Sequence, residues 1–144
     1  MTKSELLSPA AAFELGLKHM REKRWAEASV LWRTYRALYK GHPAPWVQGA
    51  ISHIRQGELQ NAGELLAEAR QLFTQHAGVW LASAEWAAMR NNPEQESAFL
   101  AEGRAKCPSH WELLGKSAAL ELKLGNLDAA EAFNLSLIHI SEPT

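Results

Sequence analysis

Two histidines of this 144-residue chain are spaced so that they could begin a metal site. His19 and His53 are separated by an interval that recurs along the chain, so we expect both side chains at equivalent places on neighbouring helices. Zinc needs three or four ligands, yet Ala87 takes the next such position and neither a CxxC nor an HExxH pattern occurs. The favoured interpretation is structural: the histidines pack between helices and hold no metal.

The single cysteine and a pair of glutamates could do other chemistry. Cys107 precedes Pro108, and a catalytic thiol needs a base and an orienting partner; His110 follows three residues later, but no third group is expected there. Glu64 and Glu68 lie four residues apart, which favours a solvated helix face over an acid–base pair. GxSxG, P-loop and GxGxxG motifs do not occur. We therefore expect no enzymatic activity and no cofactor.

The elements that position these residues are predicted to be helices throughout. The chain has 24 Ala and 20 Leu but only 11 Val, Ile and Thr together, and helices favour the first group whereas strands favour the second.

Apolar residues make up 47% and charged residues 22% of the chain, which excludes disorder. No run approaches the ~20 apolar residues of a membrane span, and residues 1–8 lack the apolar core of a signal peptide. One cysteine excludes an internal disulfide framework and fits a reducing compartment, so we expect a cytoplasmic protein.

A period of about 34 residues organises the chain. Positions separated by this interval carry small, large apolar or turn-forming residues in successive segments. The small positions are Gly16, Ala50, Ala84 and Ala118, and then Ala28, Ala62 and Ala130. The apolar positions are Ala12, Trp46, Trp80 and Leu114, and then Trp32, Leu66 and Leu100. Gly57, Asn91 and Gly125 fall together where a positive φ can end a helix. Each segment therefore reads as two amphipathic helices joined by a tight turn, and such hairpins must stack because one alone cannot bury its apolar face.

This pattern resembles the tetratricopeptide repeat (TPR) family over roughly Pro9 to Phe133. The segments that carry the resemblance are Gly57–Ala62 (GELQNA), Gly125–Ala130 (GNLDAA), Trp25–Ala28 (WAEA) followed by Trp32, and the unit-closing Pro108. Two features depart from the pattern: Glu96 replaces a small residue, and Gly41–Pro45 makes a longer link. The resemblance implies an all-α, right-handed α-solenoid of about 3.5 helix-turn-helix units.

The expected domain organisation follows from the period. Residues 1–8 form an N-terminal tail and residues 9–134 the repeat array, with units at 9–42, 43–76, 77–110 and a truncated 111–134. The predicted helices span 9–22, 25–39, 44–55, 59–74, 78–90, 93–106, 110–124 and 127 onward. Ser8 and Asn92 are expected to cap helices that begin at Pro9 and Pro93. Ser109 and Glu112 are expected to form a capping box.

The last ten residues, 135–144, break the pattern. Asn134 occupies a position that is large and apolar in the first three units, and Ile138 and Ile140 alternate with His139 in a strand-like way. The sequence LSLIHISEPT resembles the translated read-through of a transposase adapter used in DNA sequencing libraries. We therefore expect residues 135–144 to be non-native and the fourth unit to be cut within its second helix. The alternative is an ordinary frayed C-terminus.

Charge is distributed unevenly along the chain. Residues 1–45 hold eight basic and four acidic residues, net +4, whereas residues 46–134 hold seven basic and eleven acidic residues, net −4. The overall charge of −1 argues against nucleic acid as the main partner. The plain interpretation is ordinary solvated faces, and the sharper one is a basic first unit that meets an acidic partner.

The TPR resemblance places a partner-binding groove on the first helix of each unit. The expected groove residues are Phe13, Leu17, Met20, Arg21, Val47, Ile51, Ile54, Arg55, Leu81, Glu85, Met89, Leu122 and Lys123. An apolar groove with a charged rim suits an amphipathic helix or an extended segment of a partner. The alternative is that several of these residues pack within or between units.

One TPR sub-type is argued against by the residues at its binding positions. Chaperone-binding members clamp a C-terminal carboxylate with Lys, Asn and Arg side chains. The matching positions here hold Phe13, Leu17, Gln48, Gly78 and Ala82. None of them is cationic, so we expect no carboxylate clamp.

The resemblance implies a non-catalytic protein–protein interaction scaffold, bacterial and cytoplasmic, that binds a protein or peptide partner and neither nucleic acid nor membrane. The alternative hypothesis is an N-terminal docking or regulatory portion of a longer bacterial enzyme, such as a glycosyl- or sulfotransferase. The reading frame beyond Phe133 discriminates between the two. A third hypothesis is self-association through the uncapped C-terminal end.

Overall fold

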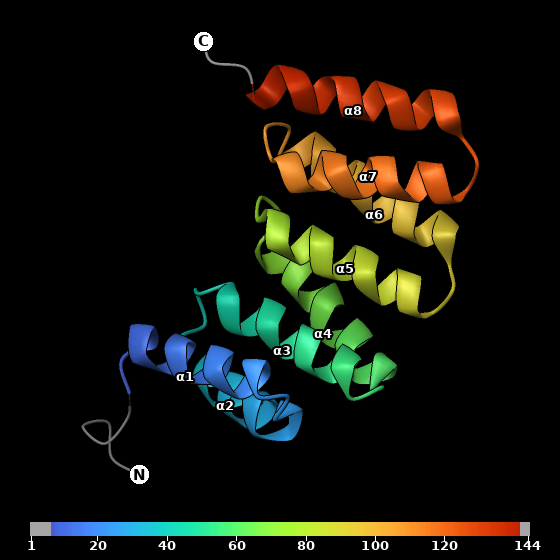
Figure 1. Cartoon of the computed structure of the whole chain (residues 1–144). Coiled ribbons are helices and arrows are strands. Elements are labelled where there is room, and N and C mark those ends of the chain that lie inside the picture. The colour runs from blue at the N-terminus through green and yellow to red at the C-terminus, as the bar shows by residue number, and fades with distance from the viewer. Residues whose placement is uncertain (1–6, 142–144) are drawn as a thin grey trace. The chain divides into compact units, whose positions relative to one another are not determined.

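The computed structural model describes residues 7–141, which hold eight α-helices and no strand (Figure 1). The helices are α1 (Pro9–Arg21), α2 (Trp25–Leu38), α3 (Ala44–Arg55), α4 (Leu59–Leu72), α5 (Ala77–Met89), α6 (Pro93–Lys106), α7 (Trp111–Lys123) and α8 (Leu127–Ser141). The predicted all-α fold is confirmed, and every predicted helix bound lies within two residues of the observed one. None of the helices among the described residues is long and apolar enough to cross a membrane.

The chain divides into two compact bodies. The N-terminal body, Met1–Leu72, contains α1 to α4, and the C-terminal body, Phe73–Thr144, contains α5 to α8. Within each body consecutive helices pack against one another, and the first helices of its two hairpins, α1 with α3 and α5 with α7, also make contact. Each body is therefore a pair of stacked helical hairpins.

The turns inside the hairpins share one backbone feature. Gly57, Asn91 and Gly125 have φ values of 77°, 55° and 84°, as the spacing predicts. Lys23, one period before Gly57, also lies in the left-handed region, with φ 60°. The sequence pattern does not predict this, because lysine has no preference for that region.

Two of the three predicted helix caps are confirmed. Ser8 Oγ accepts a hydrogen bond from the Ala11 N–H at 3.2 Å, and Asn92 Oδ1 accepts one from the Gln95 N–H at 3.1 Å. The predicted Ser109–Glu112 capping box is wrong. The His110 N–H donates to the Cys107 carbonyl at 3.1 Å and turns the chain there. Helix α7 therefore begins at Trp111, one residue later than predicted, with His110 at its N-cap and no side-chain hydrogen bond to cap it.

The N-terminal body is built around a buried tryptophan. Trp32 of α2 is 1% exposed, and a Cβ added to Gly16 of α1 would overlap its indole ring. Ala28 and Leu66 are fully buried in the same body. The small residue at position 16 therefore lets α1 approach α2, as the period predicts.

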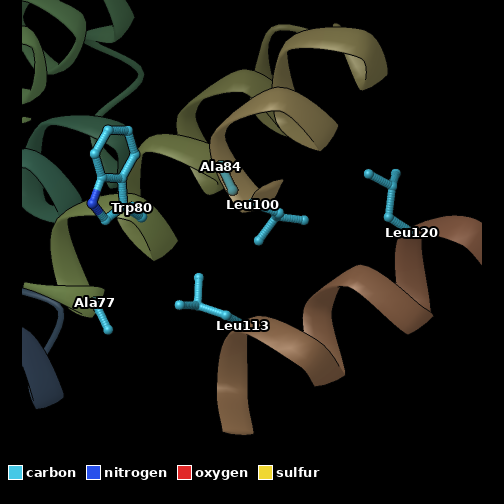
Figure 2. Packing of buried hydrophobic residues seen from close by; sticks show 6 residues of the cluster. All are labelled: Ala77, Trp80, Ala84, Leu100, Leu113 and Leu120. Carbon is cyan, nitrogen blue, oxygen red and sulfur yellow. The ribbon is translucent and has the colours of Figure 1, made fainter. Parts of the chain in front are cut away.

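The C-terminal body has a core of side chains from α5, α6 and α7 (Figure 2). The cluster consists of Ala77, Trp80, Ala84, Leu100, Leu113 and Leu120. A Cβ added to Gly103 of α6 would lie 2.8 Å from both Leu113 Cδ2 and Trp80 Cβ. The Trp80 Nε1–H donates to the Thr74 carbonyl at 2.9 Å, which fixes the indole within this core.

The final helix joins the body through its first half. Arg104 of α6 lies over the Phe133 ring, 4.5 Å from its centroid, and donates a hydrogen bond to Ser117 Oγ of α7. Arg104 is half-buried, and this burial lowers the pKa of its guanidinium, whereas the charge of Glu121 acts in the opposite direction. One side chain thus links α6, α7 and α8.

The strand-like interpretation of residues 138 and 140 is wrong. Helix α8 continues to Ser141, and within it Ser136 Oγ donates to the Ala132 carbonyl four residues earlier at 3.1 Å. Asn134 is exposed and so are Leu135 and Ile138, at 52% and 54%. Residues 142–144, with Pro143, lie outside the described residues. That residues 135–144 are non-native stays a prediction.

Candidate protein-binding surface

The predicted groove residues of the N-terminal body lie on α1 and α3, which pack against each other. Phe13, Leu17, Met20 and Ile51 are half-buried, and Arg21 and Arg55 are exposed. Val47 and Ile54 are 7% and 2% exposed, so their side chains contribute to the packed interior. The surface expected from these residues is called the N-terminal face from here on. Its apolar members are half-buried, and Arg21 and Arg55 are the last residues of α1 and α3.

The predicted groove residues of the C-terminal body lie on α5 and α7. Leu81 is half-buried against the core cluster, and Glu85 is also half-buried. Met89 and Leu122 are 52% and 60% exposed, large fractions for such apolar side chains, and Lys123 is exposed beside Leu122 in sequence. The first helices of this body thus expose two large apolar side chains, Met89 and Leu122, and one cation, Lys123.

The two histidines occupy equivalent places on α1 and α3. Both are half-buried, and His53 Nδ1 lies 3.4 Å from a carboxylate oxygen of Glu58. Among residues 7–141, no three histidine, cysteine, aspartate or glutamate side chains gather closely enough to hold a metal ion. Packing between helices is the role that these positions support.

Cys107 contacts the core of the C-terminal body, and the glutamate pair lies on the exposed surface of α4. The Cys107 thiol donates to the Gln75 carbonyl, with the sulfur 3.2 Å from the oxygen, and the side chain packs against the core cluster. Glu64 is exposed and accepts a hydrogen bond from Gln60 at 3.3 Å, one turn earlier on α4. Glu68 is also exposed.

An apolar pocket of about 290 Å³ lies in the N-terminal body, and the sequence pattern did not predict it. It is lined by the start of α1, one face of α2 and the link into α3. The lining residues are Pro9, Ala10, Ala12, Phe13, Trp32, Tyr35, Tyr39, His42, Ala44 and Pro45. The sequence feature that could have indicated this pocket is the spacing of Tyr35, Tyr39 and His42, which places three rings near the end of α2.

A second, polar hollow of about 270 Å³ lies in the same body, beside α2 and the turn after α3. Arg33, Arg36, His53 and Glu58 are among its lining residues. Burial lowers the pKa of Arg36, and the nearby charge of Arg33 lowers it further. Arg36 also lies 5.8 Å from the centre of the Trp46 ring and donates to the Pro45 carbonyl at 3.5 Å. Arg36 therefore links α2 to the start of α3.

Comparison with known proteins identifies the fold. The sequence matches no family model and no curated protein. Among solved structures, the thermophilic TPR protein TTC0263 of Thermus thermophilus superposes with a TM-score of 0.81 at 18% identity, over 93% of this chain and 74% of that one. MamA of Desulfovibrio magneticus RS-1 gives 0.72 at 8% identity, over 92% and 75%. The APC/C hetero-tetramer Cut9–Hcn1 gives 0.76 at 15% identity, over 94% of this chain and 26% of that one.

These likenesses show that the chain has the TPR fold, an all-α arrangement of helical hairpins. The family resemblance read from residues 9–133 is thereby supported at the level of fold. The backbone agrees, because the positive-φ turn positions of the described residues, Lys23, Gly57, Asn91 and Gly125, recur at the interval that the sequence repeats.

Proposed function

We propose that this protein is a non-catalytic scaffold that binds protein partners through the first helices of its hairpins. The carrying observation is exposed apolar side-chain surface on those helices at Met89 and Leu122. Val30 and Leu72 on second helices are exposed to a similar extent, so the choice of first helices follows from the TPR resemblance. The fold adds support, since one similar chain belongs to the Cut9–Hcn1 hetero-tetramer and another to a Naa15/Naa10 complex bound to HypK.

The chemistry of the N-terminal face indicates the kind of segment that it would take. Phe13, Leu17 and Ile51 offer apolar contact, whereas Arg21 and Arg55 supply exposed positive charge at the helix ends. An amphipathic helix or extended segment with apolar anchors and an acidic flank complements such a face. Because helices supply the surface, binding would need little reordering of the scaffold.

A peptide-library selection tests this proposal and does not require an identified partner. Phage-displayed peptides are selected on the full chain, and the affinity of the enriched peptide is measured by calorimetry. The double variant Leu17→Asp, Ile51→Asp should lose binding by at least about 100-fold, because each carboxylate would enter an apolar contact. Circular dichroism should report unchanged helicity.

The matched control is Val30→Asp on α2, whose side chain is 54% exposed but lies on a second helix. This variant should bind the enriched peptide as the wild type does. Unchanged affinity in the Leu17, Ile51 variant, or equal loss in the Val30 variant, would refute the assignment of the binding face.

A further inference from the structure

We propose that the polar hollow beside α2 and the turn after α3 binds a phosphate monoester group, carried by a phosphorylated protein segment or by a small phosphorylated molecule. The hollow has a volume of about 270 Å³. None of its described lining residues belongs to the predicted groove on the first helices, so this inference goes beyond the proposed function. The lining residues are Ala26, Ser29, Val30, Arg33 and Arg36 of α2, and His53, Gln56, Glu58 and Asn61 around the turn.

Two arginines of α2 supply positive charge to the hollow. Arg33 and Arg36 are three residues apart, so they lie on one face of the helix, and both line the hollow. Neither guanidinium makes an ion pair with a carboxylate within residues 7–141. Neighbouring cations without a counter-charge repel each other. An anion bound beside both of them would therefore be favoured electrostatically.

One of the two arginines is held in place by the start of α3. Arg36 donates to the Pro45 carbonyl at 3.5 Å and lies over the Trp46 ring, 5.8 Å from its centroid. Burial lowers the pKa of Arg36 and the charge of Arg33 lowers it further, whereas Glu68, which does not line the hollow, acts in the opposite direction. The two guanidiniums are therefore near enough to influence each other.

The carboxylate among the described lining residues is already engaged. Glu58 Oε2 accepts a hydrogen bond from Asn61 Nδ2 at 3.0 Å and lies 3.4 Å from His53 Nδ1. These contacts hold the negative charge on the side of the hollow formed by the turn. The α2 side, by contrast, carries two positive charges and no negative one.

A serine hydroxyl adds a hydrogen-bond donor on the α2 side. Ser29 Oγ accepts from Gln56 Nε2 at 2.9 Å, but its own hydrogen has no acceptor within residues 7–141. Serines within helices often donate to the carbonyl four residues earlier, as Ser52 and Ser117 do here at 3.0 and 2.7 Å. The Ser29 hydroxyl is instead free to donate to a ligand in the hollow.

The donors and charges of the hollow select the ligand. A phosphate monoester carries about −1.5 to −2 charges at neutral pH and three strong acceptor oxygens, which match two guanidiniums and a hydroxyl. Guanidinium groups bind phosphate oxygens through two parallel hydrogen bonds. A volume of about 270 Å³ lies just below the usual range for complete small-molecule ligands. The hollow therefore suits the phosphate group itself, with the rest of the ligand outside.

The test titrates the full chain, labelled with ¹⁵N, with inorganic phosphate and with a blocked phosphoserine, N-acetyl-O-phosphoserine N-methylamide, at pH 7. The Arg33 Nε–Hε and Gln56 side-chain amide signals should shift saturably, with a Kd below about 10 mM for at least one of the probes. Sodium chloride at the same ionic strength should not move them. Phosphoserine binding at least about fivefold tighter than inorganic phosphate would indicate a phosphorylated protein segment, whereas similar affinities would indicate a small phosphorylated molecule.

Arg33→Gln is the principal variant, because this side chain is exposed and its removal should leave the fold intact. It should weaken phosphoserine binding about tenfold or more by removing one guanidinium. Arg21→Gln is the matched control: it makes the same change of charge at an exposed residue of the same body that does not line the hollow. It should leave the affinity unchanged.

Two results would overturn the inference. The first is the absence of saturable shifts with either probe up to about 50 mM. The second is an equal loss of affinity in Arg21→Gln and Arg33→Gln, because that would show general attraction to a basic surface and no built site.

Val30→Asp separates this proposal from the proposed function. Val30 lines the hollow, so a carboxylate there should weaken phosphoserine binding several-fold by repulsion. The same variant should bind the library peptide as the wild type does, because phage-displayed peptides carry no phosphate. If phosphate probes fail to bind while the library peptide depends on Leu17 and Ile51, the hollow is misassigned and the scaffold function stands. The converse result would leave the hollow and refute the binding face.

Discussion

Lys23 occupies a backbone conformation that the other hairpin turns give to glycine or asparagine. Its φ of 60° matches those of Gly57, Asn91 and Gly125, and a side chain in the left-handed region costs roughly 1–2 kcal/mol. Lys23→Gly should therefore raise the free energy of unfolding by about 0.5–1 kcal/mol, part of the gain being offset by the greater freedom of glycine in the unfolded chain. Urea denaturation measures the change.

The control for this prediction is Lys23→Ala, which removes the charge but keeps the strained conformation. It should alter the midpoint of urea unfolding little. A stabilisation by alanine equal to that by glycine would show that charge, and not backbone conformation, matters at this turn.

Glu96 occupies a position where Ala28, Ala62 and Ala130 are buried. Burial raises the pKa of its carboxyl group, although Lys123 and Lys116 act in the opposite direction. The folded state then binds this proton more tightly than the unfolded state, so the carboxylate destabilises the fold at neutral pH. That penalty fades as the pH falls through the folded-state pKa towards the ordinary value of 4.5.

Glu96→Gln should consequently be more stable than the wild type at pH 7, with a gap that closes by about pH 4. Thermal unfolding followed by circular dichroism across this range measures the gap. A constant difference from pH 7 to pH 4 would mean that the ionisation of Glu96 is not the cause.

At the scale of the element, two glycines of the C-terminal body make a matched pair. A Cβ at Gly103 would lie 2.8 Å from Leu113 and Trp80, whereas one at Gly115 would meet nothing within 4 Å. Gly103→Ala should destabilise the protein by about 1–3 kcal/mol through overpacking between α5, α6 and α7. Gly115→Ala should stabilise it by about 0.5–1 kcal/mol through helix propensity.

Urea unfolding of both variants compares packing with propensity on one scale. Equal stabilisation by both alanines would show that α6 does not approach its neighbours as closely as Gly103 indicates.

Helices were predictable because their signals are local or periodic. Ser8 and Asn92 cap the helices expected of them, and Trp32, Leu66 and Leu100 are buried as the repeat period requires. The capping prediction for Ser109 is wrong because a backbone turn, which a motif does not reveal, determines where α7 begins. The strand-like prediction for residues 138 and 140 is wrong because short alternation is a weak signal beside a helix that continues from Leu127.

The candidate sites were less predictable than the helices. Position in the repeat placed Leu17 and Met89 on first helices, but it could not tell that Val47 and Ile54 would be nearly covered. The aromatic pocket combines Phe13 of α1 with Trp32 of α2 and Tyr39 just after it, and ring orientations depend on packing that no single period encodes.

At the scale of the whole molecule, charge separates the start of the chain from the rest. Residues 1–45 carry a net +4, and Arg21 adds exposed positive charge to the N-terminal face. Binding of a library peptide with an acidic flank should weaken several-fold when NaCl is raised from about 50 to 500 mM, because salt screens exposed charges. Calorimetry at the two salt concentrations measures the change in affinity.

Side-chain methyl NMR tests most directly the claim that first helices form the binding surface. Spectra of the full chain are recorded with and without the enriched peptide, and methyl signals of Leu17 and Ile51 are compared with those of Val30 and Leu72, both exposed on second helices at 54% and 55%. We predict that the Leu17 and Ile51 signals shift with peptide while Val30 and Leu72 stay fixed. Shifts confined to Val30 and Leu72 would contradict the account.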